Sequence, residues 1–361
     1  MEVRDDGTSK FGHRTRETPV SSNLTLSRRE FLKLSGIGML STALPSPGAV
    51  GALVPQLDGR VINPSIQAYE SPSYNSNPVR LYWKDAVLPI SGATIGDLLP
   101  EHNRIWYQIR GLGFVHSGSI QPVRTVLNEP FPEIPEGGVL GEVTVPYTDA
   151  HEAPGRLEDV VYRYYYETTH WITGLVQGDQ GVLWYRILDD KWDEREYYVL
   201  ATHLRPVPKD ELLPVSPEIP LRAKRLLVDL RTQTVTAFEW DLPVFTTRAA
   251  TGAEFSNGKF YTPTGRHMTF HKRPSRHMAR GNMAANGFDL PGVPWVCYFT
   301  ESGVAFHGTY WHNDYGRPRS HGCINLSPQS AKWIYRWTQP VVPPAEQRVY
   351  ENFGTILDIV A

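Results

Sequence analysis

The residues most capable of chemistry lie near the C-terminal end, where a histidine and a cysteine stand sixteen residues apart (323 − 307) in the stretch 307–325. A thiol is a weak nucleophile until a base takes its proton, and imidazole is suited to that task near neutral pH. Gly322 precedes the cysteine and allows a tight turn, so the amides of Gly322 and Cys323 are candidates for an oxyanion hole. We therefore interpret Cys323 as a nucleophile and His307 as its base.

A metal site is the main alternative for these side chains. His307, His312, His321 and Cys323 are ligand types that hold zinc, but their separations of 5, 9 and 2 match no common zinc pattern. We therefore predict no metal and no other cofactor. The second cysteine of the chain, Cys297, lies in an apolar run. A Cys297–Cys323 disulfide would abolish the nucleophile, so we predict that Cys297 is a buried core residue.

Composition narrows the class of protein. The 361 residues are enough for two or three domains, and the formal charge of −2 offers no basic surface for nucleic acid. Aromatic residues make up 11% of the chain, and 30 Gly and 30 Pro favour many short strands and turns over long helices. A mostly β protein that does not bind nucleic acid is expected.

The N-terminal region resembles an export signal. Residues 1–26 are polar and mixed in charge, and paired arginines then precede a short apolar segment, 34–44, that contains Gly and Ser. This pattern is similar to a twin-arginine signal and is too short to anchor the chain in a bilayer. We expect residues 1–52 to be a disordered region plus signal, and the mature protein to be a non-integral protein of the cell wall, periplasm or extracellular space. A basic helix start on a cytosolic protein is the alternative.

An internal repeat occupies the middle of the chain. Each copy reads as a Trp-Tyr strand, a hairpin and a second strand that ends in Pro-Val, with upstream strands of similar plan: 79–83, 105–109 and 114–123, then 142–147, 183–187 and 197–207. We predict two small, half-open β-barrels that resemble Src-homology-3-like modules. The expected divisions are a linker at 53–78, modules at 79–130 and 135–210, and a Pro-rich linker at 211–223. Such modules bind wall glycan or peptide, although their aromatic residues equally suit small cores.

The C-terminal part, 224–361, resembles the catalytic domain of bacterial L,D-transpeptidases of the YkuD type. The resemblance rests on His307-Gly308, on the run from Ser320 to Asn325, and on three upstream stretches: 225–238, 261–265 and 293–299. It implies a β-sandwich, with a short helix after the nucleophile. Ser327 and Pro328 supply an N-cap and a first helical residue for a helix over 329–337. The segment 279–290, rich in Gly, Asn and Met, is a candidate flap over the site.

The resemblance also implies roles for individual residues. The carbonyl of Gly308 would accept the other ring hydrogen of His307 and fix its tautomer, in place of a carboxylate. His321 would either assist proton transfer or shape the turn. The candidates for contact with substrate are Ser320, Asn325, Tyr310 and Arg319, each of which would otherwise serve to fix or pack the loop.

By the same resemblance, Cys323 would attack a peptidoglycan tetrapeptide stem, release D-alanine and hold a thioester that an amine on a neighbouring stem resolves as a 3→3 cross-link. The partners implied are donor and acceptor stem peptides. Two other functions stay open: an L,D-carboxypeptidase or endopeptidase that uses the same cysteine and histidine, and a wall-binding scaffold with a degenerate catalytic domain.

Overall fold

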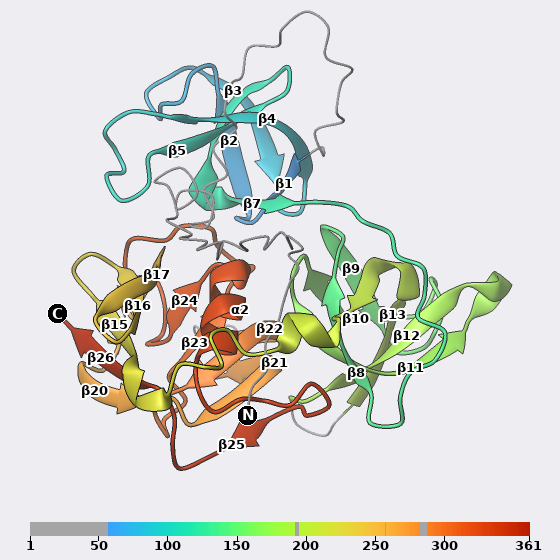
Figure 1. The fold of residues 1–361 in the computed structure, drawn as a ribbon. Helices are drawn as coiled ribbons and strands as arrows, with labels where there is room; N and C mark the ends of the chain where they lie inside the picture. The colour runs from blue at the N-terminus through green and yellow to red at the C-terminus, as the bar shows by residue number, and fades with distance from the viewer. Residues whose placement is uncertain (1–56, 192–194, 257, 282–286) are drawn as a thin grey trace, which may run out of the picture.

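The computed structural model describes residues 57–191, 195–256, 258–281 and 287–361. Figure 1 shows two small β modules and a larger C-terminal domain. We call them the first module (57–123), the second module (139–206) and the C-terminal domain (224–361). The predicted twin-arginine segment lies outside the described residues. Within the described part of the chain, no helix is long and apolar enough to cross a membrane.

The first module is a seven-stranded antiparallel sheet with the order β3-β2-β6-β5-β4-β1-β7. A single turn of 3-10 helix, η1 (Ser117–Ser119), joins β6 to β7. The strands are β1 (Leu57–Val61), β2 (Ser65–Tyr69), β3 (Pro78–Trp83), β4 (Val87–Ile95), β5 (Ile105–Ile109), β6 (Gly113–His116) and β7 (Ile120–Val123).

The second module repeats this arrangement strand for strand, in the order β10-β9-β13-β12-β11-β8-β14. Short 3-10 turns η2 (Asp179–Gly181) and η3 (Ala201–His203) lie in its connections. Its strands are β8 (Val139–Val143), β9 (Tyr147–His151), β10 (Val160–Tyr165), β11 (Thr169–Gln177), β12 (Leu183–Asp189), β13 (Arg195–Leu200) and β14 (Leu204–Pro206). The internal repeat expected from the sequence is therefore present in the fold.

One boundary of the predicted modules was wrong. Residues 53–78 are not a linker throughout, because β1 and β2 lie within them, and in the described part of this range residues 62–64 and 70–77 connect the strands. Each strand has only five residues, and β1 does not alternate, so the pair gave too short a periodic signal to be recognised, although burial alternates along β2. The modules were predicted to be half-open, and in the described residues each sheet keeps two separate edges, β3 and β7 or β10 and β14.

The C-terminal domain contains two five-stranded sheets, with the orders β17-β16-β15-β26-β20 and β24-β23-β22-β21-β25. A hairpin across residues 231–234 joins β15 to β16, within the stretch 225–238 that carries the resemblance. The strands are β15 (Lys224–Asp229), β16 (Thr234–Glu239), β17 (Leu242–Arg248), β18 (Glu254–Phe255), β19 (Gly258–Lys259), β20 (Gly265–Met268), β21 (His271–Arg280), β22 (Phe288–Tyr298), β23 (Ala305–Gly308), β24 (Ile324–Leu326), β25 (Val349–Tyr350) and β26 (Ile356–Val360).

The predicted short helix follows the nucleophile strand as α2 (Pro328–Trp337). The Ser327 hydroxyl accepts the N–H of Ser330 at 3.2 Å, and Pro328 occupies the first turn, where no N–H is needed. The Pro-rich segment before the domain carries η4 (Lys209–Leu212) and η5 (Leu221–Ala223) and lies along α2, since the N–H of Val215 donates to the carbonyl of Arg336 at 3.1 Å.

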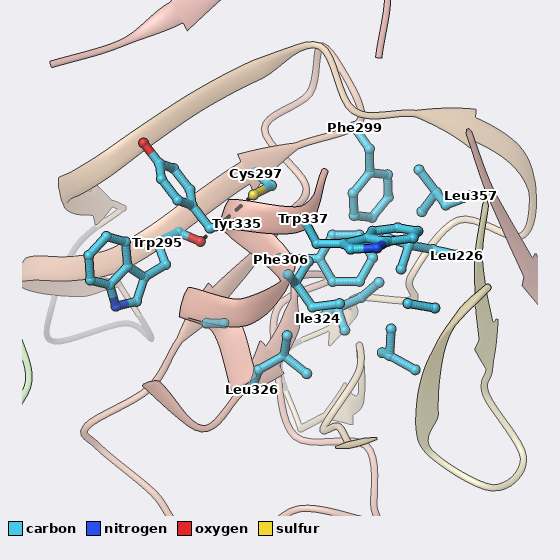
Figure 2. Close-up of a cluster of buried hydrophobic side chains, with 14 of the residues drawn as sticks. Leu226, Trp295, Cys297, Phe299, Phe306, Ile324, Leu326, Tyr335, Trp337 and Leu357 are labelled. Carbon is cyan, nitrogen blue, oxygen red and sulfur yellow. Dashed lines mark hydrogen bonds between the residues drawn. The ribbon is translucent and has the colours of Figure 1, made fainter. Parts of the chain in front are cut away.

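The core of the C-terminal domain lies between α2 and the sheets (Figure 2). It contains Phe306 of β23 and Ile324 of β24 from one sheet, Leu226 of β15 from the other sheet, and Trp337 from the helix. Cys297 is fully buried in this cluster as a free thiol, as predicted. Burial of such large apolar side chains fixes the positions of β23 and β24, which carry the candidate site.

Candidate active site

The two candidate catalytic residues project from one face of neighbouring strands. Strands β23 and β24 are parallel, and Phe306 lies opposite Ile324 while His307 lies opposite Asn325. Because side chains alternate along a strand, the apolar pair faces the core beneath α2, and His307 lies on the opposite face. Cys323 directly precedes β24 and packs with that opposite face. The fold thus brings the predicted nucleophile and base to the same side of the sheet.

His307 is buried and held as one tautomer. Its Nδ1 lies 3.0 Å from the carbonyl of Gly308, so Nδ1 carries the proton and Nε2 presents a lone pair. Burial lowers the pKa of His307 to about 4, an effect that the Gly308 contact only partly offsets. The imidazole is therefore a neutral base at physiological pH. Gly308 is required for packing, because a Cβ there would meet Pro294 Cγ at 2.8 Å and Pro328 Cα at 3.0 Å.

Cys323 is partly buried, with Sγ 3.8 Å from the carbonyl of Gly303. Burial raises the pKa of the Cys323 thiol to about 11, although the backbone of Ala305 favours the thiolate to a smaller extent. Among the described residues, no hydrogen bond joins Sγ to the ring of His307. The resting pair is therefore a neutral thiol and a neutral imidazole, and the proton must move when substrate arrives.

The turn before the cysteine is tied by Ser320. Its hydroxyl donates to the carbonyl of Cys323 at 2.5 Å and accepts the N–H of Gly322 at 3.1 Å. Gly322 has φ +113°, which disfavours any side chain, and its carbonyl accepts the Thr262 hydroxyl at 2.7 Å. Ser320 therefore fixes the loop. Of the two amides expected in the oxyanion hole, that of Gly322 is already committed, whereas that of Cys323 donates to no loop or side-chain acceptor in the described chain.

A neighbouring segment, 249–253, clamps this turn and was missed by the sequence analysis. The N–H groups of Arg319 and Ser320 both donate to the carbonyl of Thr251, at 2.7 and 2.9 Å. Thr251 is fixed in turn by Gln233, whose side-chain carbonyl accepts its N–H at 2.9 Å. Ala250 bridges to Asn325 on the other side of the cysteine. Both ends of the nucleophile loop are thus held by backbone hydrogen bonds, which follow from tertiary pairing and leave no motif in the sequence.

Asn325 and His312 form a buried pair behind the site. Nδ2 of Asn325 lies 2.9 Å from Nε2 of His312, and the N–H of Asp314 lies 3.3 Å from Nδ1 of the same ring. Burial, followed by the charge of Arg319, lowers the pKa of His312 to about 3, so the ring stays neutral. Asn325 is 2% exposed, which makes it a residue that fixes the loop.

The remaining predicted residues lie at different edges of the site. His321 is exposed, and its ring stacks on Phe255 at 4.9 Å between centroids and meets the edge of Phe260 at 4.6 Å. His321 thus packs against aromatic rings, and among the described residues it forms no hydrogen bond to His307 or Cys323. The described part of the predicted flap is the base of the β21–β22 hairpin, and its residues 282–286 lie outside the described chain.

Tyr310, for which substrate contact and loop packing were both left open, is buried at a domain junction. Its ring stacks on Tyr165 of the second module at 5.2 Å, and its carbonyl accepts Nη2 of Arg60 in the first module at 2.7 Å. The side chain is only 4% exposed, so packing between the modules explains it. Arg319 likewise donates within the loop, from Nη1 to Asp314 Oδ2 at 3.0 Å.

The first module docks on the loop between His307 and Cys323. The N–H of Asn313 donates to the carbonyl of Gly118 in η1 at 3.3 Å, and the Asn313 side chain donates to the carbonyl of Ile120 at 3.0 Å. Asp314 Oδ1 lies 2.8 Å from Nε2 of His102. Burial alone would raise the pKa of Asp314, but the His102 hydrogen bond and the Arg317 charge outweigh it and lower the pKa to about 2. The module is therefore part of what positions the catalytic loop.

The described residues contain no group of three or more His, Cys, Asp and Glu side chains that would hold a metal ion. The arrangement is instead that of a cysteine acyl-transfer site: a thiol and a tautomer-fixed imidazole share one face of a parallel strand pair, and a backbone amide lies at the nucleophile.

The family of this site is identified by its sequence. Residues 223–347 match the family model YkuD, described as the L,D-transpeptidase catalytic domain. The chain therefore carries a YkuD-type L,D-transpeptidase catalytic domain, and L,D-transpeptidases are acyltransferases with a cysteine nucleophile. No curated protein matches the chain.

Solved structures of L,D-transpeptidases are similar over parts of the chain. The match to the enzyme from Stackebrandtia nassauensis has 21% identity and a TM-score of 0.27, and covers 43% of this chain and 60% of that one. The match to the enzyme from Xylanimonas cellulosilytica has 22% identity and a TM-score of 0.27, and covers 43% of this chain and 64% of that one. The match to the enzyme from Mycobacterium smegmatis has 16% identity and a TM-score of 0.32, and covers 52% of this chain and 98% of that one. The chain thus spans less than two thirds of the first two structures.

Proposed function

We propose that the chain is an exported L,D-transpeptidase that forms 3→3 cross-links between peptidoglycan stem peptides. The observation that carries the proposal is the placement of His307 and Cys323 on one face of β23 and β24, within a segment that matches the YkuD family model. The paired arginines and the apolar segment near the N-terminus support export.

In the first half-reaction, Cys323 Sγ attacks the carbonyl between the diamino acid and the terminal D-alanine of a tetrapeptide stem, while Nε2 of His307 takes the thiol proton. The Cys323 N–H would donate to the oxyanion. The C–N bond then breaks, the imidazolium gives its proton to the departing amine of D-alanine, and a thioester remains on Cys323.

In the second half-reaction, an amine from an acceptor stem attacks the thioester and gives its proton to His307. The new amide forms the 3→3 cross-link, and the sulfur leaves and is reprotonated. The bond that breaks supplies the driving force, so no ATP is needed. Attack by water at the same thioester would give L,D-carboxypeptidase activity.

Incubation of the purified protein with a disaccharide-tetrapeptide, followed by mass spectrometry of the products, tests this function. A cross-linked dimer minus one D-alanine is expected for wild type and for Cys297→Ala, whose cysteine is buried in the core, but not for Cys323→Ala. Formation of the tripeptide alone would replace the transpeptidase proposal with a carboxypeptidase. No product from a folded protein with a reduced Cys323 would favour a wall-binding scaffold.

A further inference from the structure

The two modules carry the same three-residue corner, built from different side chains. In the first module, Arg60 on β1 lies opposite Gln121 on β7. In the second, Glu142 on β8 lies opposite Arg205 on β14. The corner is completed by the turn after the edge strand, where Asp85 (φ 67°) and Glu167 (φ 61°) share the same unusual backbone conformation. We call these the first corner (Arg60, Asp85, Gln121) and the second corner (Glu142, Glu167, Arg205).

The first corner binds a peptide group from another part of the chain. Arg60 donates from Nη1 to Asp85 Oδ1 at 2.9 Å and from Nη2 to the carbonyl of Tyr310 at 2.7 Å. Its guanidinium also lies 4.0 Å from the ring centroid of Tyr165. Arg60 is 1% exposed, so the corner is filled by a peptide carbonyl and an aromatic ring. This contact shows that the corner can bind a peptide carbonyl beside an aromatic ring.

The second corner opens into a cavity of about 440 Å³ between the second module and α2. Figure 1 shows α2 on the side of the C-terminal domain that faces this module. The helix contributes Gln329, Lys332, Trp333 and Arg336 to the cavity wall, and the connection between the modules contributes Arg124 and Val126. We call this space the α2 cavity.

The α2 cavity has an excess of positive charge. Arg205 is paired with Glu142 at 2.5 Å and with Glu211 at 2.7 Å, and Lys332 is paired with Glu211 at 2.5 Å. Burial, followed by repulsion from Glu142, raises the pKa of Glu167 to about 8, so this carboxyl group is mainly neutral at pH 7.

Two arginines in the cavity wall remain available for a ligand. Among the described residues, Arg124 and Arg336 form no ion pair. Within the described chain, Arg336 donates from Nε to the carbonyl of Leu213 at 2.8 Å and from no other nitrogen, which leaves its terminal nitrogens for an acceptor. A guanidinium binds a carboxylate through two parallel hydrogen bonds, so each arginine suits an acidic group.

We propose that the α2 cavity is a second peptide-binding site, which takes a short acidic peptide with its carboxylates on Arg124 and Arg336 and its apolar part on Trp333. A peptide is favoured as ligand because the equivalent corner of the first module binds a peptide carbonyl and an aromatic ring. This site is separate from Cys323 and does not depend on acyl transfer there.

Calorimetric titration of the full chain carrying Cys323→Ala tests the proposal without turnover. The probe is acetyl-Ala-Glu-Ala with a free C-terminal carboxylate. The comparison probes are acetyl-Ala-Gln-Ala-amide, which has no carboxylate, and inorganic phosphate. We expect saturable binding of the acidic peptide and at least tenfold weaker binding of the uncharged one.

Added Arg124→Ala and Arg336→Ala substitutions should together weaken binding of the acidic peptide at least tenfold, whereas Arg110→Ala, at an exposed arginine of the first module, should leave it unchanged. Arg124→Ala alone should weaken binding of the acidic peptide severalfold. Because this substitution removes no described hydrogen bond, it separates loss of binding from any effect of Arg336→Ala on folding. No binding of the acidic peptide, equal binding of the uncharged peptide, or affinity unaffected by the arginine substitutions would overturn the proposal. Binding of phosphate as tight as that of the peptide would replace it with a general anion site.

Discussion

The two modules have the same strand order and the same corner, yet they meet the C-terminal domain in opposite ways. The first corner is closed over Tyr310, within the loop that joins His307 to Cys323. The second corner lines an open cavity beside α2, and its Glu167 accepts the side-chain N–H of Gln329 from that helix at 2.5 Å. At the equivalent strand positions, Arg60 stands in one module and Glu142 in the other. The two modules thus share one fold but differ in a few charged residues. The first module positions the catalytic loop, and the second keeps an accessible surface.

The difference is also one of burial. Arg60 is held by hydrogen bonds to Asp85, Gln121 and the Tyr310 carbonyl, so almost none of it reaches solvent. Arg205 is about 30% exposed and pairs with carboxylates near the surface. Because a buried charge depends on every partner, the first corner should be far more sensitive to substitution than the second.

The largest effect is expected when the guanidinium of the first corner is removed. Arg60→Met leaves the Tyr310 carbonyl and one Asp85 oxygen without their partner, and should destabilise the protein by about 3–5 kcal/mol. The matched change in the second corner, Glu142→Gln, should cost about 1 kcal/mol or less, because its ion pair is partly exposed. Urea unfolding followed by tryptophan fluorescence measures both. Equal losses would show that the two corners do not differ as the contacts indicate.

Acid should destabilise the loop that the first module covers. The pKa of His307 is about 4 and that of His312 about 3, both below the value near 6.5 of an unfolded histidine. Between those values the unfolded state binds protons that the folded state does not, so the free energy of unfolding must fall as pH drops from about 6.5 to 4. For His307 alone this amounts to roughly 3 kcal/mol.

Thermal unfolding across this pH range, for wild type and His312→Gln, checks the sign. The variant lacks one of the buried rings, so its unfolding temperature should depend less steeply on pH. An unfolding temperature that rises as pH falls from 6.5 to 4 would contradict the neutral, buried state assigned to these histidines.

A rise in pH from 4.5 to 8 should act on the second corner, with the opposite sign. The pKa of Glu167 is raised to about 8, so between pH 4.5 and 8 the folded state retains a proton that the unfolded state has lost. Stability contributed by this carboxyl group is therefore present below pH 4.5 and declines as pH rises through 8. Glu167→Gln should remove that decline and stabilise the protein by about 1 kcal/mol at pH 8.

The equivalent change in the first corner, Asp85→Asn, provides the comparison. It weakens ion pairs with Arg60 and Arg163, at 2.9 and 3.1 Å, and should destabilise the protein at pH 8. Thermal unfolding of both variants at pH 5 and pH 8 is the measurement. A destabilised Glu167→Gln at pH 8 would show that the carboxyl group is ionised and well paired in the folded protein.

Much of the fold followed from local sequence patterns. The Trp-Tyr strands 105–109 and 183–187 were visible because apolar and polar residues alternate, and α2 was visible because Ser327 and Pro328 form a helix start. The catalytic pair was indicated by residue type, a nearby glycine and a family resemblance. Cys297 was placed in the core because it lies in an apolar run.

What sequence patterns did not reveal depends on tertiary contacts. Strands β1 and β2 are short and partly polar, so they were assigned to a linker. Tyr310 was left open between substrate contact and loop packing, because no local signal shows that Tyr165, far away in the chain, covers its ring. The roles of Arg60 and Gln233 are equally non-local, since each acts through hydrogen bonds to residues that only the folded chain brings near.

The central claim is that Cys323 is the nucleophile and His307 its base, and intact-mass spectrometry with a carbapenem tests it most directly. Wild type and Cys297→Ala should each gain a single adduct, Cys323→Ala none, and His307→Gln an adduct that forms about 10²–10⁴ times more slowly. An adduct that persists in Cys323→Ala, or no adduct on folded wild-type protein with a reduced Cys323, would contradict the account.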